Sequence, residues 1–135
     1  MWWVTNLITL IDGSTLMKSL LTALFLFAPI AASAACAPTD FTVQNFTVTV
    51  SNGGIRPRMN MKGQLVNHCA QAAAAELQIQ ARDGSGSPLE TKKGWPAGTT
   101  NIAPGKSVTF DLGRLFHYQA QMQTYAVGVV SVRSW

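Results

Sequence analysis

The chain has 135 residues, of which 47% are hydrophobic and only 12% are charged, and its formal net charge at pH 7 is +4. This length suits one ordinary domain built around one hydrophobic core. The basic residues are scattered and are not interleaved with aromatic residues, which argues against a nucleic-acid reader and leaves only a mild attraction to anionic partners.

The N-terminal part of the chain has the order of features found in an export signal. Lys18 is followed by an apolar run, Leu20–Phe27, then by the helix-breaking Pro29 and the small residues Ala32-Ser33-Ala34. A basic start, an apolar centre and a small-residue cleavage site define a secretory signal peptide. The sequence therefore predicts a signal peptide over residues 1–34 and an exported domain over residues 35–135, in the periplasm or secreted by a bacterium.

Three alternatives to this interpretation stay open. The apolar run is shorter than the ~20 residues that a membrane-spanning helix needs, so a retained anchor is less favoured. Cys36 follows small residues as in an outer-membrane lipoprotein, but Ser33 stands where that motif has an aliphatic residue. Residues 1–16 carry Asp12 and no basic residue, so we expect translation to begin at Met17; the other interpretation is a membrane-associated extension.

The exported part contains two cysteines, Cys36 and Cys69. In an oxidising compartment an isolated pair has one partnership, so we predict a disulfide. It would close a loop of roughly 34 residues, worth on the order of 3 to 4 kcal/mol in the chain-entropy model. The alternative is a lipidated Cys36 with a buried, free Cys69. His68 and His117 lack the spacing of zinc ligands, so neither a metal nor another cofactor is expected.

Alternating apolar and polar residues, separated by turn signals, predict about seven short β-strands. The clearest segments are Phe41–Val50, Arg58–Cys69, Glu76–Arg82, Leu89–Trp95, Ser107–Leu112 and Gln123–Ser134. We expect an all-β fold, an immunoglobulin-like antiparallel β-sandwich, with a small closed barrel as the competing architecture.

Several local features refine this expectation. The alternation of the first strand slips at Gln44-Asn45, which predicts a β-bulge or a strand that changes sheets. Ala70–Ala75 is expected to form a loop or one helical turn, and Gly113–Gln121 a crossover loop with a short helical turn. Lys92 and Lys93 are typical of a protected edge strand. The last strand is apolar on both faces, which predicts a central position.

Two stretches resemble the bacterial extracytoplasmic immunoglobulin-like domains named for an FxLYD motif. They are LQIQARDGSGSPLE, which looks like a strand, an Asp-x-x-Gly turn and a strand, and NIAPGKSVTFDL, which looks like the Pro-Gly entry to a later strand. The resemblance implies an immunoglobulin-like fold in an envelope or secreted protein, with no catalytic residues to carry over. The cysteine pair is also similar to that of pilus subunits, which are sandwiches with a disulfide near the first two strands.

The sequence offers no constellation of catalytic side chains. Two histidines and five scattered acidic residues in the exported part supply no nucleophile with a base and no paired carboxylates, so we do not expect an enzyme. The candidate binding patch is aromatic and lies on loops: Trp95, Phe116, His117 and Tyr118. The other interpretation, which we favour, is that these residues cap the ends of the core.

The function predicted from these observations is that of a non-enzymatic exported module of the bacterial cell envelope, which acts by protein–protein contact with an envelope protein whose identity the sequence does not give. The alternative is a pilus-type subunit of a surface polymer assembled by strand exchange. Contact with a membrane is expected only through the leader or a lipid on Cys36.

Overall fold

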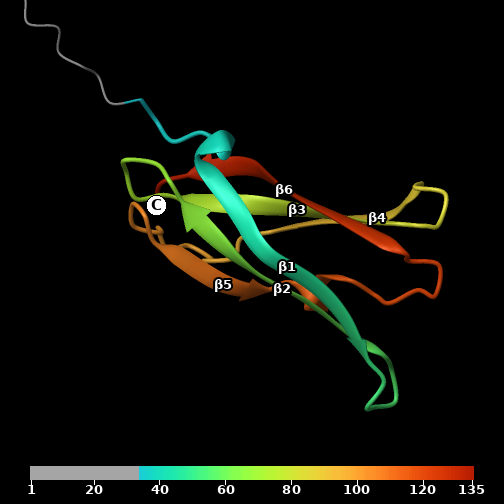
Figure 1. Ribbon diagram of the computed structural model, residues 1–135. Helices are drawn as coiled ribbons and strands as arrows, with labels where there is room; N and C mark the ends of the chain where they lie inside the picture. The colour runs from blue at the N-terminus through green and yellow to red at the C-terminus, as the bar shows by residue number, and fades with distance from the viewer. Residues whose placement is uncertain (1–33) are drawn as a thin grey trace, which may run out of the picture. The chain divides into compact units, whose positions relative to one another are not determined.

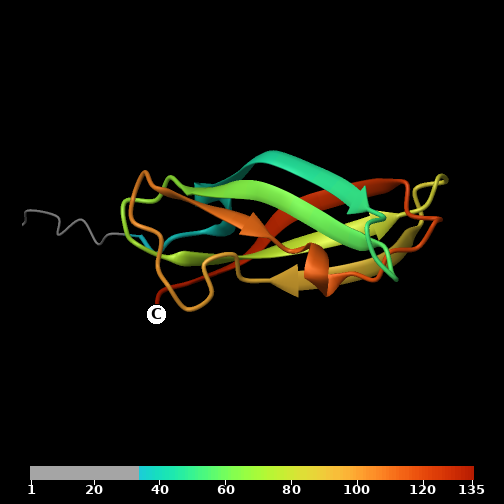
Figure 2. The same ribbon diagram turned by 90° about the horizontal axis from the view of Figure 1, so that it is seen from below.

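The computed structural model describes residues 34–135, and the predicted signal peptide therefore lies almost wholly outside the described residues. The described part is an antiparallel β-sandwich of two three-stranded sheets (Figures 1 and 2). One sheet has the order β1-β2-β5 and the other the order β4-β3-β6. The strands are β1 (Phe41–Ser51), β2 (Arg58–Asn67), β3 (Ala74–Arg82), β4 (Pro88–Gly94), β5 (Ser107–Asp111) and β6 (Thr124–Arg133). The predicted all-β sandwich is confirmed.

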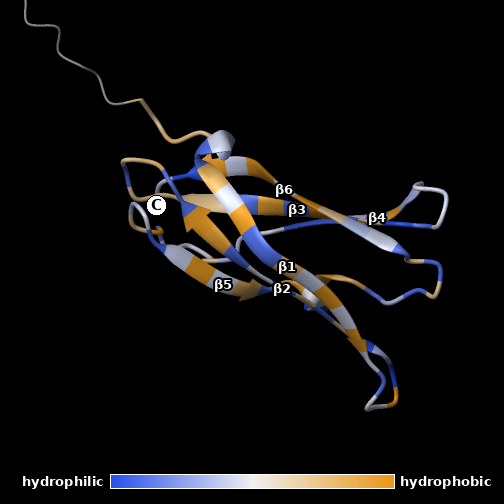
Figure 3. Cartoon of the chain, viewed as in Figure 1, coloured by the Kyte–Doolittle hydropathy of each residue, from blue (hydrophilic) through white to orange (hydrophobic). Residues whose placement is uncertain are grey.

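The core lies between the two sheets and follows from the alternation of apolar and polar residues, which Figure 3 shows most plainly along β1. Successive side chains of a strand point to opposite faces, so every second residue is buried. On β2 and β3 this pattern is nearly complete, and their inner faces hold the most deeply buried side chains: Met61, Leu65, Leu77 and Ile79. The sheets remain separate within residues 34–135, so the competing closed barrel is not formed.

The bulge predicted in the first strand is present. The pairing of β1 with β2 shifts register between Gln44 and Thr47, and Asn45 has a φ of 52°. Asparagine tolerates this left-handed conformation better than most residues do. The extra residue allows Val43 before the bulge and Phe46 and Val48 after it to pack against the same core.

The prediction of about seven strands was one too many for the described residues, which contain six. Gly113–Leu115 forms the short 3-10 helix η3, in line with the expected helical turn in a crossover loop. The loop before β5 contributes only an isolated bridge, between Ala73 and Ile102. A second correction concerns the expected loop at Ala70–Ala75, because β3 begins at Ala74 and not at Glu76. Ala73, Ala74 and Ala75 are almost fully buried, and side chains this small fit a crowded strand pair.

The position predicted for the last strand was wrong, because β6 pairs only with β3 and lies at the edge of its sheet. Its outer face carries Ala126, Gly128 and Val130, which are exposed. The small apolar residues on this solvated face give β6 the same sequence pattern as a strand that is buried on both faces. The central strand of this sheet is β3. Within residues 34–135, no helix is both long and apolar enough for a bilayer.

The predicted disulfide between Cys36 and Cys69 is formed, with the two Cα atoms 5.7 Å apart. Cys36 precedes the 3-10 helix η2 (Pro38–Asp40), and Cys69 follows the end of β2. Because β1 and β2 are antiparallel, the start of the first and the end of the second lie together. The bridge therefore fixes η2 at one end of the sandwich, where η2 lies against β6.

Asn67 is a fully buried polar residue beside this bridge. Its Nδ2 donates to the carbonyls of Gln71 and Ile102, at 2.9 and 2.7 Å, and its Oδ1 accepts from the backbone N–H of Cys69 at 2.8 Å. The backbone of Asn67 also pairs with Gly105 and Lys106. All hydrogen-bonding groups of the amide have partners, so its burial is stabilising and joins β2, the disulfide and the loop before β5.

Candidate functional site

The four aromatic and histidine residues predicted as a binding patch do not form one surface. Trp95 follows β4, and its ring lies edge-on to that of Trp135 at a centroid distance of 5.9 Å. The guanidinium of Arg133 lies 4.8 Å from the Trp135 ring centroid and 5.8 Å from that of Trp95, within cation–π range. Trp95 therefore belongs to an aromatic cluster at the C-terminal end of β6.

The other three predicted residues follow η3. Phe116 is only 6% exposed and belongs to the core, which agrees with the interpretation that it caps the core and not with a place in an exposed binding patch. His117 and Tyr118 are exposed. Burial raises the pKa of Tyr125, near the start of β6, and the proximity of Tyr118 raises it further. Tyr118 therefore lies near the end of β6 opposite to the end that Trp95 covers.

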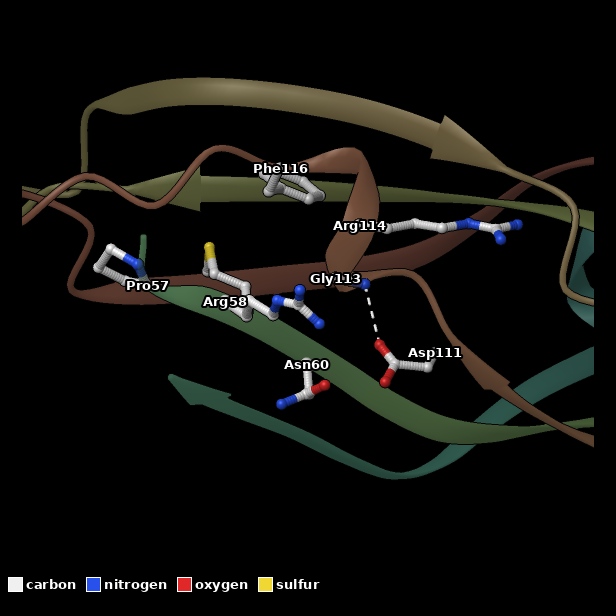
Figure 4. A pocket seen from close by; sticks show the side chains of 8 residues that line it. Pro57, Arg58, Asn60, Asp111, Gly113, Arg114 and Phe116 are labelled. Atoms are coloured by element: carbon white, nitrogen blue, oxygen red, sulfur yellow. Dashed lines mark hydrogen bonds between the residues drawn. The ribbon is translucent and has the colours of Figure 1, made fainter. Parts of the chain in front are cut away.

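Phe116 forms part of the wall of a cavity of about 510 Å³ that sequence reasoning did not predict (Figure 4). Arg58, Met59 and Asn60 at the start of β2 form one side, and Asp111 and Arg114, which flank the turn between β5 and η3, form the other. Met59 and Phe116 are buried, and both arginines are exposed. The cavity thus combines an apolar wall with a cationic rim, and its volume is in the range of small-molecule sites.

The floor of this cavity is held by backbone contacts. The Oδ1 atom of Asp111 accepts hydrogen bonds from the backbone N–H groups of Met61, at 2.9 Å, and Gly113, at 3.0 Å. A Cβ atom at Gly113 would overlap the Met59 carbonyl and come within 2.8 Å of the Asn60 Cα. Only glycine permits the η3 turn to approach β2 this closely, so the turn is fixed against the strand.

Among residues 34–135, neither arginine at the cavity takes part in an ion pair. The one ion pair found among residues 34–135 joins Lys92 to Glu90 on β4, which leaves the guanidinium groups of Arg58 and Arg114 without a carboxylate. Arg58 also lines a second cavity of about 340 Å³, together with residues of the loop that precedes β2. In Figure 4 the Arg58 guanidinium is directed toward the η3 turn, and Arg114 leaves that turn on its other side.

A second candidate surface is the free edge of β6. The strand has ten residues and pairs on one side only, with β3. On its inner face Tyr125, Val127, Val129 and Val132 are partly buried against the core. β1 lies beside β6 on this side of the sandwich and contributes further partly buried apolar residues, Val43, Phe46 and Val48. This side of the described domain therefore presents an apolar row and an unpaired strand together.

The sequence predicted neither the cavity nor the free edge of β6, for two different reasons. The cavity brings together residues about 50 positions apart in the sequence. The sequence features at these positions, an arginine after a proline and a glycine before an arginine, are too common to indicate a site. Whether β6 has a free edge depends on which strands pair with it. The alternation of apolar and polar residues does not determine that pairing. Within residues 34–135, no group of three His, Cys, Asp or Glu side chains could hold a metal ion.

Comparison with known proteins identifies no relative. No protein-family model, no curated protein and no solved structure matches the chain. Any proposal about function therefore depends on the sequence and the geometry of this chain alone.

Proposed function

We propose that the chain is a non-enzymatic, exported module of the bacterial cell envelope that binds another envelope protein by adding an extended strand of that protein to the free edge of β6. One observation carries the proposal. β6 is a long edge strand whose inner face is apolar and carries no charge before Arg133, its last residue.

Edge strands expose unpaired N–H and C=O groups and invite pairing with another chain, so proteins normally protect them. The opposite edge of the same sheet has such protection, because Lys92 and Glu90 of β4 lie on its inner face, paired with Ile79 and Ala81 of β3. On the β6 side the same two residues of β3 pair with Val127 and Tyr125. Of the two edges of this sheet, the β6 edge is therefore the one without inward charges.

Strand addition also accounts for the apolar row. A strand that pairs with β6 gains main-chain hydrogen bonds, and every second side chain of it points toward the space between β6 and β1. There it would cover Val127 and Val129 of β6 and Phe46 of β1, which are only partly buried in the domain alone. The expected partner segment is therefore extended, with apolar residues at alternate positions.

The proposed location is periplasmic or secreted. The disulfide between Cys36 and Cys69 is compatible with an oxidising compartment outside the cytoplasm. The export signal predicted from the sequence supports the same location. Because Cys36 takes part in the disulfide, lipidation of its sulfur is not part of the proposal.

Site-specific photo-cross-linking in the producing bacterium tests this proposal. A photoreactive amino acid is placed at Ala126 on β6 or, as a matched control, at Thr91 on β4; both positions are exposed on edge strands of one sheet. We expect a discrete adduct from position 126 and none from position 91. The further substitution Val127→Lys should abolish the adduct, because it gives β6 the inward charge that β4 already has.

Val127→Lys must leave the domain folded for this test to be informative. Val127 is only partly buried, so a lysine there can extend its ammonium to solvent, and we expect a loss of about 1 to 2 kcal/mol. Circular dichroism checks the fold. Equal adducts from both edges, or an adduct that survives Val127→Lys in a folded protein, would contradict strand addition at β6.

A pilus-type subunit that polymerises by strand exchange is the second candidate, since β6 and the neighbouring β1 could accept a strand from another copy. If the signal peptide is removed after Ala34, only Ala35 precedes Cys36, which is too short to donate a strand. A strand from a different protein is therefore favoured. Size-exclusion chromatography after periplasmic expression separates the two: a ladder of oligomers supports the polymer subunit, and a single monomer peak opposes it. Intact mass reports the cleavage site and the disulfide.

A further inference from the structure

The cavity between β2 and the η3 turn differs chemically from the β6 edge, because charged side chains line it. We propose that it binds a carboxylate group attached to an apolar group, as at the C-terminus of a peptide. Arg58 and Arg114 would bind the carboxylate, and Met59 and Phe116 would contact the apolar part. This inference does not depend on the proposed function, because none of these residues lies on β6.

The charges at the cavity define the class of ligand. The lining of the cavity carries two guanidinium groups, those of Arg58 and Arg114, and one carboxylate, that of Asp111, so one positive charge is uncompensated. Guanidinium groups bind planar oxyanions through two parallel hydrogen bonds. A carboxylate carries a single negative charge and would leave the site neutral. A phosphate carries roughly 1.5 to 2 negative charges at pH 7 and would leave the site with a net negative charge.

Asp111 has a further role in this arrangement. Its Oδ1 atom is engaged by the backbone N–H groups of Met61 and Gly113, whereas no described residue hydrogen-bonds to Oδ2. Oδ2 can therefore accept a hydrogen bond from the ligand. A peptide C-terminus supplies such a donor, since the last amide N–H lies close to the terminal carboxylate. The side chain of the last residue would then face the buried Met59 and Phe116.

The rigidity of the floor favours binding. The approach of Gly113 to Met59 and Asn60 and the two hydrogen bonds to Asp111 hold the η3 turn against β2 without a ligand. Only the two exposed arginine side chains must be ordered when a ligand enters. A site whose backbone is already in place loses less entropy on binding than one that forms around its ligand.

The test is an NMR titration of the isotopically labelled, disulfide-bonded protein with three probes: N-acetyl-Ala-Ala-Leu with a free carboxylate, the same peptide as its C-terminal amide, and inorganic phosphate. We expect saturable shifts of the amide signals of Asn60, Asp111 and Gly113 with the free carboxylate only. Arg58→Gln should weaken binding about tenfold and Arg114→Gln several-fold, because each removes a charge-assisted hydrogen-bonding group. Arg82→Gln, on the outer face of β3, is the charge-matched control and should change affinity less than about twofold.

Three outcomes would overturn the inference. The amide peptide could bind as well as the free acid, which would leave only apolar contact. Phosphate could bind more tightly than the carboxylate, which would make this a general anion site. Finally, Arg58→Gln could leave the affinity unchanged while its spectrum shows an intact fold, which would place the peptide elsewhere. The absence of saturable shifts with any probe also contradicts a carboxylate site.

Discussion

The two edges of the β4-β3-β6 sheet flank the same central residues but differ in what they present to another chain. Ile79 of β3 pairs with Lys92 on the β4 side and with Val127 on the β6 side. Ala81 pairs with Glu90 and Tyr125 in the same way. Since cross-strand partners share a face, both charged residues of β4 lie on the inner face of the sandwich.

The difference has a direct energetic consequence. The Nζ atom of Lys92 lies 3.3 Å from Oε1 of Glu90, and both side chains retain some exposure. A strand that paired with β4 would remove them from water, and burying charges is costly even when they are paired. A strand that paired with β6 would instead cover apolar surface, which is worth roughly 25 cal/mol per Å². One edge therefore resists association and the other favours it.

The largest expected effect comes from the disulfide, which holds η2 against β6. The double substitution Cys36→Ser and Cys69→Ser should lower the free energy of unfolding by about 3 to 4 kcal/mol, measured by chemical denaturation. Because η2 lies against β6, amide hydrogen exchange should accelerate more in β6 than in β4. Equal acceleration in the two strands would show that the bridge does not act on the β6 edge in particular.

Asn67 tests a stabilising group that should affect both edges of the sheet equally, since its side chain hydrogen-bonds to neither β4 nor β6. Asn67→Ala should cost about 2 to 3 kcal/mol, because it removes the three hydrogen bonds of a buried amide and leaves the Cys69 N–H without its acceptor. Chemical denaturation measures the loss, and exchange in β4 and β6 should rise together. Asn52→Ala, in an exposed loop, is the matched control and should change stability by less than about 0.5 kcal/mol. A selective effect on one edge would contradict this account of Asn67.

The protective role of Lys92 can be removed at modest cost. Lys92→Val replaces a partly exposed ion pair by an apolar contact with Ile79, so we expect stability to change by no more than about 1 kcal/mol. The variant should self-associate with rising concentration, seen by analytical ultracentrifugation. Lys93 is next to Lys92 but lies on the outer face of β4, so Lys93→Val should self-associate no more than the parent protein does. Identical behaviour of the two variants would refute the protective role of the inward charge.

The smallest expected effect is a dependence of stability on pH that arises from Tyr125 on β6. Burial raises the pKa of this phenol in the folded state above its ordinary value of about 10, so folding favours the neutral form. Its contribution to stability is complete below pH 10 and is lost as the pH rises through the folded pKa. Denaturation curves of the parent and of Tyr125→Phe should therefore diverge only above about pH 10. Divergence near neutral pH would point to another titrating group.

The sequence predicted those features that depend on local pattern. The phase slip at Gln44-Asn45 located the bulge of β1, because a change in alternation moves side chains to the other face. The turn signal around Asp83 located the β3–β4 hairpin, and there the side chain of Ser85 is the main cause of the lowered pKa of Asp83. The lysines of Leu89–Trp95 identified an edge strand. The site residues were less predictable, since Phe116 is buried in the core and the ring of Trp95 packs against that of Trp135.

The sequence alone was sufficient to determine an all-β sandwich with one disulfide. Alternation of apolar and polar residues is a local pattern that shows which side chains of a strand are buried. Two cysteines can form only one pair. Only the tertiary structure decided that β6 lies at an edge and that Arg58 and Arg114 line the same cavity. Both depend on which distant segments become neighbours. That choice is made by the packing of the whole core, which no single stretch of sequence encodes.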